Sequence, residues 1–150
     1  MIRVQHFLII LVLSVLGCKS TQQSKGEIYP IITFEKTGCL GTCPAYTFKA
    51  FPDGAVTYSG KDYVELKGLY KAKITKEELA SLRKLFDDAD FFNYANVYSA
   101  SIKDIPTTYL YYDNGSQNSK ITDHYGAPES LKSLEADIEK FIKAIDWQDN

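Results

Sequence analysis

Short runs in which apolar and polar residues alternate, separated by turn signals, recur along this chain of 150 residues. Alternation with a period of two is typical of a strand that buries one face. The runs predict strands near 31–36 and 64–74, a hairpin over 45–60 around Pro52-Asp53-Gly54, and a second hairpin over 107–122 around Asn114-Gly115. Because strands joined by hairpins pair antiparallel, the chain is expected to build an antiparallel sheet.

Two segments instead carry apolar residues at helical spacing. A capping box begins at Thr75, and apolar residues follow at intervals of three or four up to about residue 89. Pro128 is expected at the first position of a second helix, whose apolar stripe ends at Ile145. The predicted order is β-β-β-β-α-β-β-α, which implies an α+β fold with both helices packed on one face of the sheet. The segment 92–106 has no periodicity and is expected to be an irregular loop, where a contact site would lie.

The N-terminus carries a short apolar segment that ends in a cysteine. Residues 7–16 form an apolar run of about 15 Å as a helix, half the thickness of a bilayer core and typical of a signal peptide. The run ends in Val15-Leu16-Gly17-Cys18, which resembles the lipobox of bacterial lipoproteins. This resemblance implies that the Cys18 thiol receives a diacylglycerol. An ordinary secretory signal with a chance cysteine is the alternative.

We therefore expect a lipoprotein signal peptide, a lipidated cysteine with a flexible tether, and one globular domain, over residues 1–17, 18–29 and 30–147. Two or three acyl chains anchor a protein stably, so the expected location is the cell envelope. Lys19 lacks the acid that retains some lipoproteins in the inner membrane, which favours the outer membrane of a Gram-negative bacterium, on its periplasmic or surface face. A formal charge of −2 without a basic stripe predicts no nucleic-acid partner.

Two further cysteines, Cys39 and Cys43, lie four residues apart. Outside the cytoplasm such a pair is expected to form a disulfide, and Gly38 and Gly41 allow the loop to close. A redox pair is the alternative, but the residues after Pro44 alternate like a strand, so no helix N-terminus lowers the pKa of a thiol. Two cysteines and one histidine in the mature chain are too few for a structural zinc site. Neither a metal nor a cofactor is expected.

The cysteine loop also resembles a known family. Gly38-Cys39-Leu40-Gly41-Thr42-Cys43-Pro44-Ala45-Tyr46, read with Asp53-Gly54 and Tyr58, is similar to the Gly-Cys-x-Gly-x-Cys-Pro-x-Tyr motif of a family of envelope lipoprotein domains of unknown function. The segments Asp104-Ile105-Pro106-Thr107 and Asp123-His124-Tyr125-Gly126-Ala127-Pro128 resemble its recurrent stretches. The resemblance covers about residues 30–145 and implies the extent of the domain, but no activity.

Three polar residues outline one candidate site. His124 is the only histidine of the mature chain, and with Asp104 and Asp123 it defines a possible hydrolase centre. Neighbouring residues on a strand point to opposite faces, so Asp123 is not expected to orient His124. The simpler expectation is that Asp123 organises the turn into the last helix.

Four tyrosines outline a second candidate site. Tyr46, Tyr58, Tyr109 and Tyr111 are a candidate stacking surface for a glycan or a peptide, and core packing is the alternative. No catalytic set is recognised beside them. The sequence therefore predicts a non-enzymatic interaction module, held at the membrane through Cys18 and binding an envelope protein or a glycan. The alternatives are a thiol–disulfide redox protein that uses the cysteine pair and, second, a hydrolase.

Overall fold

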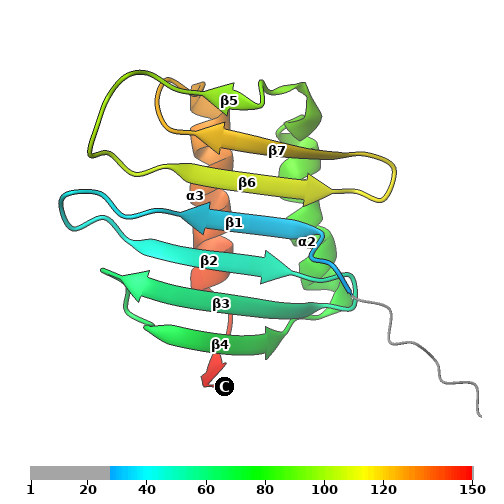
Figure 1. Cartoon of the computed structure of the whole chain (residues 1–150). Helices are drawn as coiled ribbons and strands as arrows, with labels where there is room; N and C mark the ends of the chain where they lie inside the picture. The colour runs from blue at the N-terminus through cyan, green and yellow to red at the C-terminus, as the bar shows by residue number, and fades with distance from the viewer. Residues whose placement is uncertain (1–27, 150) are drawn as a thin grey trace, which may run out of the picture.

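The computed structural model describes residues 28–149 as an eight-stranded sheet with two helices packed on one face (Figure 1). The strand order is β5-β7-β6-β1-β2-β3-β4-β8. Neighbouring strands pair antiparallel, except β5 and β7, which are parallel. The predicted α+β class, with an antiparallel sheet and two helices behind it, is confirmed.

The elements follow the predicted order, with two short strands and one helical turn added. The strands are β1 (Ile32–Lys36), β2 (Ala45–Ala50), β3 (Ala55–Asp62), β4 (Gly68–Lys73), β5 (Val97–Tyr98), β6 (Thr108–Asp113), β7 (Asn118–Asp123) and β8 (Gln148–Asp149). The helices are α2 (Lys76–Asp88), the short 3-10 helix η2 (Phe91–Asn93) and α3 (Glu129–Lys143). Both predicted hairpins form, as β2–β3 and β6–β7.

The first strand occupies the middle of the sheet. β1 pairs with β2, the next strand in the sequence, and with β6 from the second half of the chain. Phe34 of β1 lies opposite Phe48 on one side and Leu110 on the other, so one line of apolar side chains crosses all three strands. The two halves of the chain are thereby joined through β1.

The core lies between the sheet and the helices. Phe34, Phe48 and Leu110 are 0% exposed, because alternate strand residues point under the helices. The helices cover them with apolar residues at helical spacing, among them Leu82 and Ile138, which are also 0% exposed. Burial of this surface is the main source of stability.

An aromatic cluster fixes α2 against β6. The ring centroids of Phe86 and Tyr112 lie 4.6 Å apart, and those of Phe86 and Phe91 lie 5.1 Å apart. The Tyr112 hydroxyl donates a hydrogen bond to Oδ1 of Asp87 at 3.2 Å. Burial, together with the nearby Asp87 carboxylate, raises the pKa of Tyr112 to about 12. The hydroxyl therefore stays neutral and keeps donating over the physiological pH range.

The beginning of each helix tests a prediction about capping. The capping box is present, since Thr75 Oγ1 accepts from the backbone N–H of Glu78 at 3.1 Å and Glu78 Oε2 accepts from Thr75 N–H at 2.7 Å. Pro128 is the N-cap residue of α3 and not its first helical residue, because its ψ of 155° is extended. The helix therefore begins one residue later than predicted.

The strand predicted over 64–74 is shorter, because β4 begins at Gly68. Two left-handed residues, Tyr63 with φ of 52° and Gly68 with φ of 107°, bracket the intervening segment and turn it out of the sheet. The alternating residues Val64 and Leu66 consequently pack beside the core as a turn and not as a strand. The alternating pattern alone does not indicate that this segment leaves the sheet.

The segment 92–106 is less irregular than predicted. It begins inside η2, and β5 then pairs in parallel with β7 over two residues. The backbone carbonyl of Tyr98 accepts hydrogen bonds from His124 and Tyr125. Two-residue pairings leave no periodic pattern in a sequence, which is why this strand was not predicted.

The predicted signal peptide, Cys18 and most of the predicted tether lie outside the described residues. The described chain enters β1 at one end of the sheet, through Ile28 (Figure 1). Within residues 28–149, no helix has both the length and the hydropathy required to cross a membrane.

Candidate functional site

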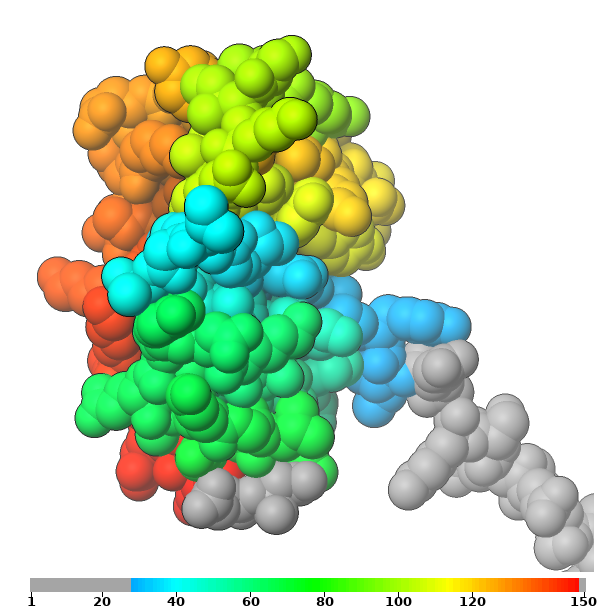
Figure 2. Space-filling view, turned by 60° about the vertical axis from the view of Figure 1, so that its left-hand side comes forward, coloured from blue at the N-terminus to red at the C-terminus, as the bar shows by residue number. Residues whose placement is uncertain are grey.

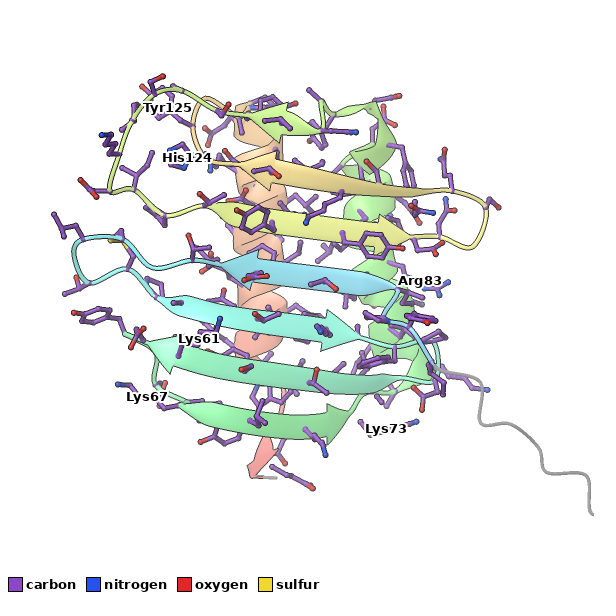
Figure 3. The ribbon with its side chains drawn as sticks, viewed as in Figure 1. Lys61, Lys67, Lys73, Arg83, His124 and Tyr125 are labelled. Carbon is purple, nitrogen blue, oxygen red and sulfur yellow. A yellow bond between two sulfur atoms is a disulfide. The ribbon has the colours of Figure 1, made fainter. Side chains whose placement is uncertain are left out.

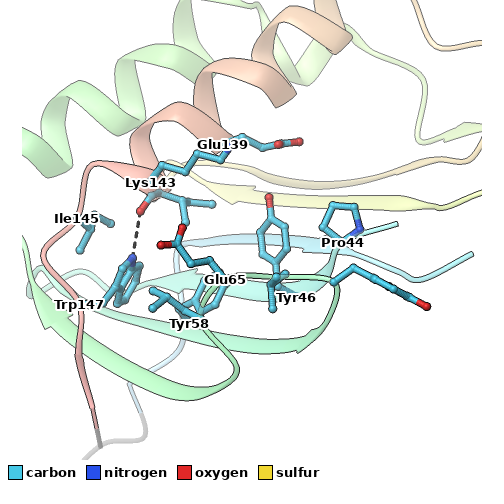
Figure 4. Close-up of a pocket in the computed structure, with 12 residues that line it drawn as sticks. Pro44, Tyr46, Tyr58, Glu65, Glu139, Lys143, Ile145 and Trp147 are labelled. Atoms are coloured by element: carbon cyan, nitrogen blue, oxygen red, sulfur yellow. Dashed lines mark hydrogen bonds between the residues drawn. The ribbon is translucent and has the colours of Figure 1, made fainter. Parts of the chain in front are cut away.

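A pocket of about 630 Å³ opens between the C-terminal part of α3 and the end of the sheet where β2 begins and β3 ends (Figure 4). The volume lies within the range of small-molecule sites. The lining is mostly aromatic and aliphatic, with three charged side chains. It consists of Pro44, Tyr46, Tyr58, Tyr63, Val64, Glu65, Leu66, Glu139, Ile142, Lys143, Ile145 and Trp147.

Packed aromatic rings form the floor of this pocket. Tyr46 and Tyr58 lie on the helix-facing side of β2 and β3, with their ring centroids 5.3 Å apart. The ring of Trp147 lies 5.5 Å from that of Tyr58, and its indole N–H donates to the carbonyl of Ile142 at 3.0 Å. That hydrogen bond ties the segment after α3 to the helix and holds the indole ring in place. The floor is therefore an aromatic surface built from two strands and the segment after α3.

The turn 63–67 forms one wall, and Gly60 allows it to approach. Val64 and Leu66 line the pocket from this turn. A Cβ atom on Gly60 would lie 1.9 Å from the carbonyl oxygen of Leu66, a distance that no side chain can accommodate. Only glycine lets the turn pack this closely over β3. Gly60 thus shapes the pocket without lining it.

Charged groups of both signs surround the opening. Glu65 and Lys143 are exposed, while Glu139 makes a 2.6 Å ion pair with Lys36 of β1. Burial, and then the nearby negative charge of Glu139, raises the pKa of Tyr46 far above its ordinary value. The Tyr46 hydroxyl is therefore a neutral hydrogen-bonding group in the pocket floor.

Asp123 belongs to a buried ionic cluster and not to an accessible site. It is 1% exposed, and its carboxylate contacts the ammonium group of Lys132. Glu135, 6% exposed, accepts from Lys132 and from the Thr108 hydroxyl, each at 3.4 Å. Burial and the adjacent Asp123 carboxyl raise the pKa of Glu135 to about 7. The cluster of two carboxyl groups and one ammonium group is neutral when the two carboxyl groups share one proton.

The structure does not bring Asp104, Asp123 and His124 into one constellation. His124 places Nδ1 at 2.8 Å from the Thr107 hydroxyl and Nε2 at 2.8 Å from the carbonyl of Ile102. Both ring nitrogens are therefore occupied by groups other than the two carboxylates. Asp104 is exposed in the 99–107 loop with φ of 64°. His124 fastens this loop to the end of β7.

The four predicted tyrosines lie on two faces of the sheet. Tyr46 and Tyr58, each 7% exposed, lie under the helices in the pocket floor. Tyr109 and Tyr111 occupy the alternate positions of β6, between the buried residues Thr108, Leu110 and Tyr112, and so point to the open face. The structure thus brings together two pairs and not one surface of four.

Cys39 and Cys43 form the predicted disulfide, with their Cα atoms 5.6 Å apart. The bridge closes the loop between β1 and β2, and the backbone N–H of Gly41 donates to the Cys39 sulfur at 3.2 Å. The exposed Leu40 lies in this ring. Because β2 follows directly, the loop leads into a strand and not into a helix N-terminus that would activate a thiol.

Sequence reasoning missed Trp147, Tyr63, Glu65, Glu139 and Lys143 as residues of the pocket. None belongs to a recognisable motif, and they come from a turn, a helix and the segment after that helix. The one available signal is that Trp147 is the only tryptophan of the chain. Within residues 28–149, no group of three potential metal ligands comes together.

Comparison with known proteins identifies a family for this chain. The model of a family described as a domain of unknown function, DUF6438, matches residues 30–142. No curated protein matches the chain. The matched residues include the disulfide loop, both hairpins and nearly all of α3.

Proposed function

We propose that this chain, which belongs to the DUF6438 family of domains of unknown function, is a lipid-anchored binding module of the cell envelope. Its ligand would occupy the aromatic pocket beside Trp147. The observation that carries the proposal is the pocket itself, with a floor of packed aromatic rings, aliphatic walls and charged side chains in its lining.

The lining defines the chemistry of the ligand. Aromatic faces and the aliphatic walls favour a ligand with an apolar face. The Glu65 carboxylate can accept hydrogen bonds and the Lys143 ammonium can donate them, so the ligand would also carry polar groups along its edge. A sugar ring and a short peptide share this chemistry. The envelope offers both, and the binding experiment distinguishes them.

The lipid anchor is supported by the N-terminal sequence. The apolar run at 7–16 ends in Gly17-Cys18, the arrangement expected for acylation. In the described chain, Ile28 leads into the beginning of β1, whereas the pocket lies where β2 begins, at the opposite end of these antiparallel strands. An anchor at Cys18 would thus leave the pocket open. We propose the outer membrane of a Gram-negative bacterium as its location.

Trp147 provides the binding assay, since it is the only tryptophan and lines the pocket. The full-length protein in detergent is titrated with soluble cell-wall glycan fragments and, separately, with short peptides. We expect one class to change the Trp147 fluorescence saturably, and Glu65→Gln to weaken that binding about tenfold, the loss typical of one charged hydrogen bond. Tyr109→Ala, on the open face, is the matched control and should bind normally. A fluorescence unchanged by both classes would refute the pocket as the binding site.

The anchor is tested separately. Cells that express the chain are labelled with a radioactive or clickable fatty acid, and Cys18→Ser is the comparison. We expect label in the native chain and none in the variant. An unlabelled native chain would refute lipidation without affecting the pocket assay.

A further inference from the structure

The sheet face that the helices leave open concentrates positive charge. Its side chains occupy the strand positions that alternate with the core positions. The charged residues on this face are Lys49, Lys61, Lys71, Lys73 and Lys120, against Glu35, Asp113 and Asp62, which pairs with Ala45 beyond the bulge at the end of β3. The whole chain has 17 basic and 19 acidic residues and is slightly negative, whereas this face carries a net positive charge.

The lysines are spread over the face and do not form a compact cluster. Lys120, Lys49 and Lys71 lie in one register line, which crosses the sheet from β7 to β4 through Tyr111 and Thr33. With strands about 4.8 Å apart, Lys120 and Lys49 are separated by about 14 Å, and Lys49 and Lys71 by about 10 Å.

Lys61 and Lys73 lie toward opposite ends of the strands (Figure 3). Lys73 also pairs with Asp53 of the β2–β3 turn at 3.0 Å, with both side chains exposed. A small anion could contact only one of these widely spaced ammonium groups. An extended negative surface could contact all five, which favours a planar partner.

Apolar and aromatic side chains lie among the lysines. Tyr109 and Tyr111 point to this face, and the ammonium of Lys120 lies 5.2 Å from the centre of the Tyr109 ring. Leu69 of β4, on the same face, is 60% exposed. Tyrosine and lysine together are typical of protein surfaces at the lipid headgroup level.

The chain that precedes the described residues limits the distance to a bilayer. Cys18 and Ile28 are ten residues apart, which even fully extended span at most about 35 Å. An acylated Cys18 would therefore keep the open face within reach of the headgroups. The chain enters at one end of the strands. The space-filling view shows the other end of the domain, where the cyan, green and yellow-green loops lie close together (Figure 2).

We propose that the open sheet face lies against an anionic lipid surface, with the helices and the pocket directed away from it. The inference rests on the proposed anchor at Cys18. The anchor determines that the domain stays at the membrane, and the lysines determine its orientation there. Each lysine near an anionic bilayer contributes a factor of about five to this preference, and salt screens the effect.

Lysine acetylation of the full-length protein in vesicles tests the orientation. The protein is reconstituted in phosphatidylcholine vesicles with and without phosphatidylglycerol, and acetylation rates are read by mass spectrometry. We expect phosphatidylglycerol to slow the acetylation of Lys49, Lys61, Lys71 and Lys120 at least fivefold, and 0.5 M salt to abolish the difference. Lys76 and Lys140, exposed on the helices, should react equally in both vesicles.

Charge variants supply the second test. In Lys49→Gln/Lys71→Gln/Lys120→Gln, we expect Lys61 to lose its protection in anionic vesicles. In the control Lys76→Gln/Lys84→Gln/Lys140→Gln, whose changes lie on the two helices, Lys61 should stay protected.

The outcomes separate the two proposals. A protein that does not float with either vesicle refutes the anchor and, with it, the orientation. A protein that floats but is acetylated equally in both vesicles refutes the orientation alone. If a dissolved polyanion, added with neutral vesicles, protected the lysines from acetylation as well as anionic vesicles do, the partner of this face would be an anionic polymer. That result would refute the lipid surface as the partner.

Discussion

Replacing Glu135 with glutamine should make the domain more stable at alkaline pH and leave it nearly unchanged at acidic pH. Glu135 is 6% exposed and faces Asp123, which is 1% exposed, with Lys132 as their shared cation. Burial and the Asp123 carboxyl raise the pKa of Glu135 from its ordinary 4.5 to about 7. Glutamine has nearly the same shape, carries no charge, and leaves the contact between Lys132 and Asp123 in place.

The sign of the pH dependence follows from which state, folded or unfolded, binds the proton on Glu135. Between pH 4.5 and pH 7 the folded domain holds a proton on Glu135 that the unfolded chain has released. The free energy of unfolding therefore falls as the pH rises through this window, and the loss is complete above pH 7. The difference between the two pKa values corresponds to about 3 kcal/mol. Below pH 4.5 both states are protonated, and this contribution to the pH dependence disappears.

Urea denaturation followed by circular dichroism at pH 4.5, 6, 7 and 8.5 measures the effect. We expect the free energy of unfolding of Glu135→Gln to exceed that of the native chain by about 3 kcal/mol at pH 8.5. At pH 4.5 the two free energies should agree within about 0.5 kcal/mol. Asp137→Asn, a charge removal at an exposed position of the same helix, controls for net charge. A Glu135→Gln effect that is the same at all four pH values would refute the shared proton.

Three further predictions concern local geometry. Gly60→Ala should displace the 63–67 turn, since its Cβ would lie 1.9 Å from the Leu66 carbonyl, and Trp147 fluorescence should shift while the far-ultraviolet circular dichroism is kept. An unshifted emission would show that the turn does not depend on Gly60. Removing the disulfide with Cys39→Ser/Cys43→Ser should cost about 2 kcal/mol in urea denaturation, as expected for so small a ring. A loss above about 4 kcal/mol would contradict a purely local role. Thr75→Ala should destabilise α2 by about 1 kcal/mol, whereas Thr75→Ser should be nearly neutral; equal losses would argue against the cap.

Much of the fold could be predicted because its determinants are local. Alternation within each strand, the turn at Pro52-Asp53-Gly54 and the capping box at Thr75 each depend on a few neighbouring residues. The strand predicted at 64–74 is longer than the observed one, because left-handed residues at Tyr63 and Gly68 interrupt it and alternation carries no information about φ. β5 was missed because its two residues are defined by their partner β7 and not by their own pattern.

The division of the four tyrosines between two faces is encoded in strand parity. Tyr46 shares its parity with Phe48, so its side chain lies on the core side of β2. Tyr109 and Tyr111 alternate with Leu110, so their side chains point outward from β6. The positions of these residues within their strands are therefore sufficient to separate the two pairs, whereas residue type alone groups all four.

The pocket could not be predicted, because its residues meet only after the helices have docked. Trp147 lies four residues beyond α3, and its hydrogen bond to Ile142 folds that segment back over β3. The buried acid cluster has the same origin. Glu135 and Lys132 come from α3 and Asp123 from β7, so their proximity depends on tertiary packing.

The central position of β1 has a mechanical consequence. A pull on the N-terminal segment is transmitted along the axis of β1, which is bonded over five residue pairs to β2 on one side and over five to β6 on the other. To extract the strand, the hydrogen bonds on both sides must be sheared together, whereas an edge strand can be peeled away one bond at a time. A domain tugged from this end should therefore resist force far better than one held by its C-terminal strand, β8, which pairs with β4 over only two residues at the rim of the sheet.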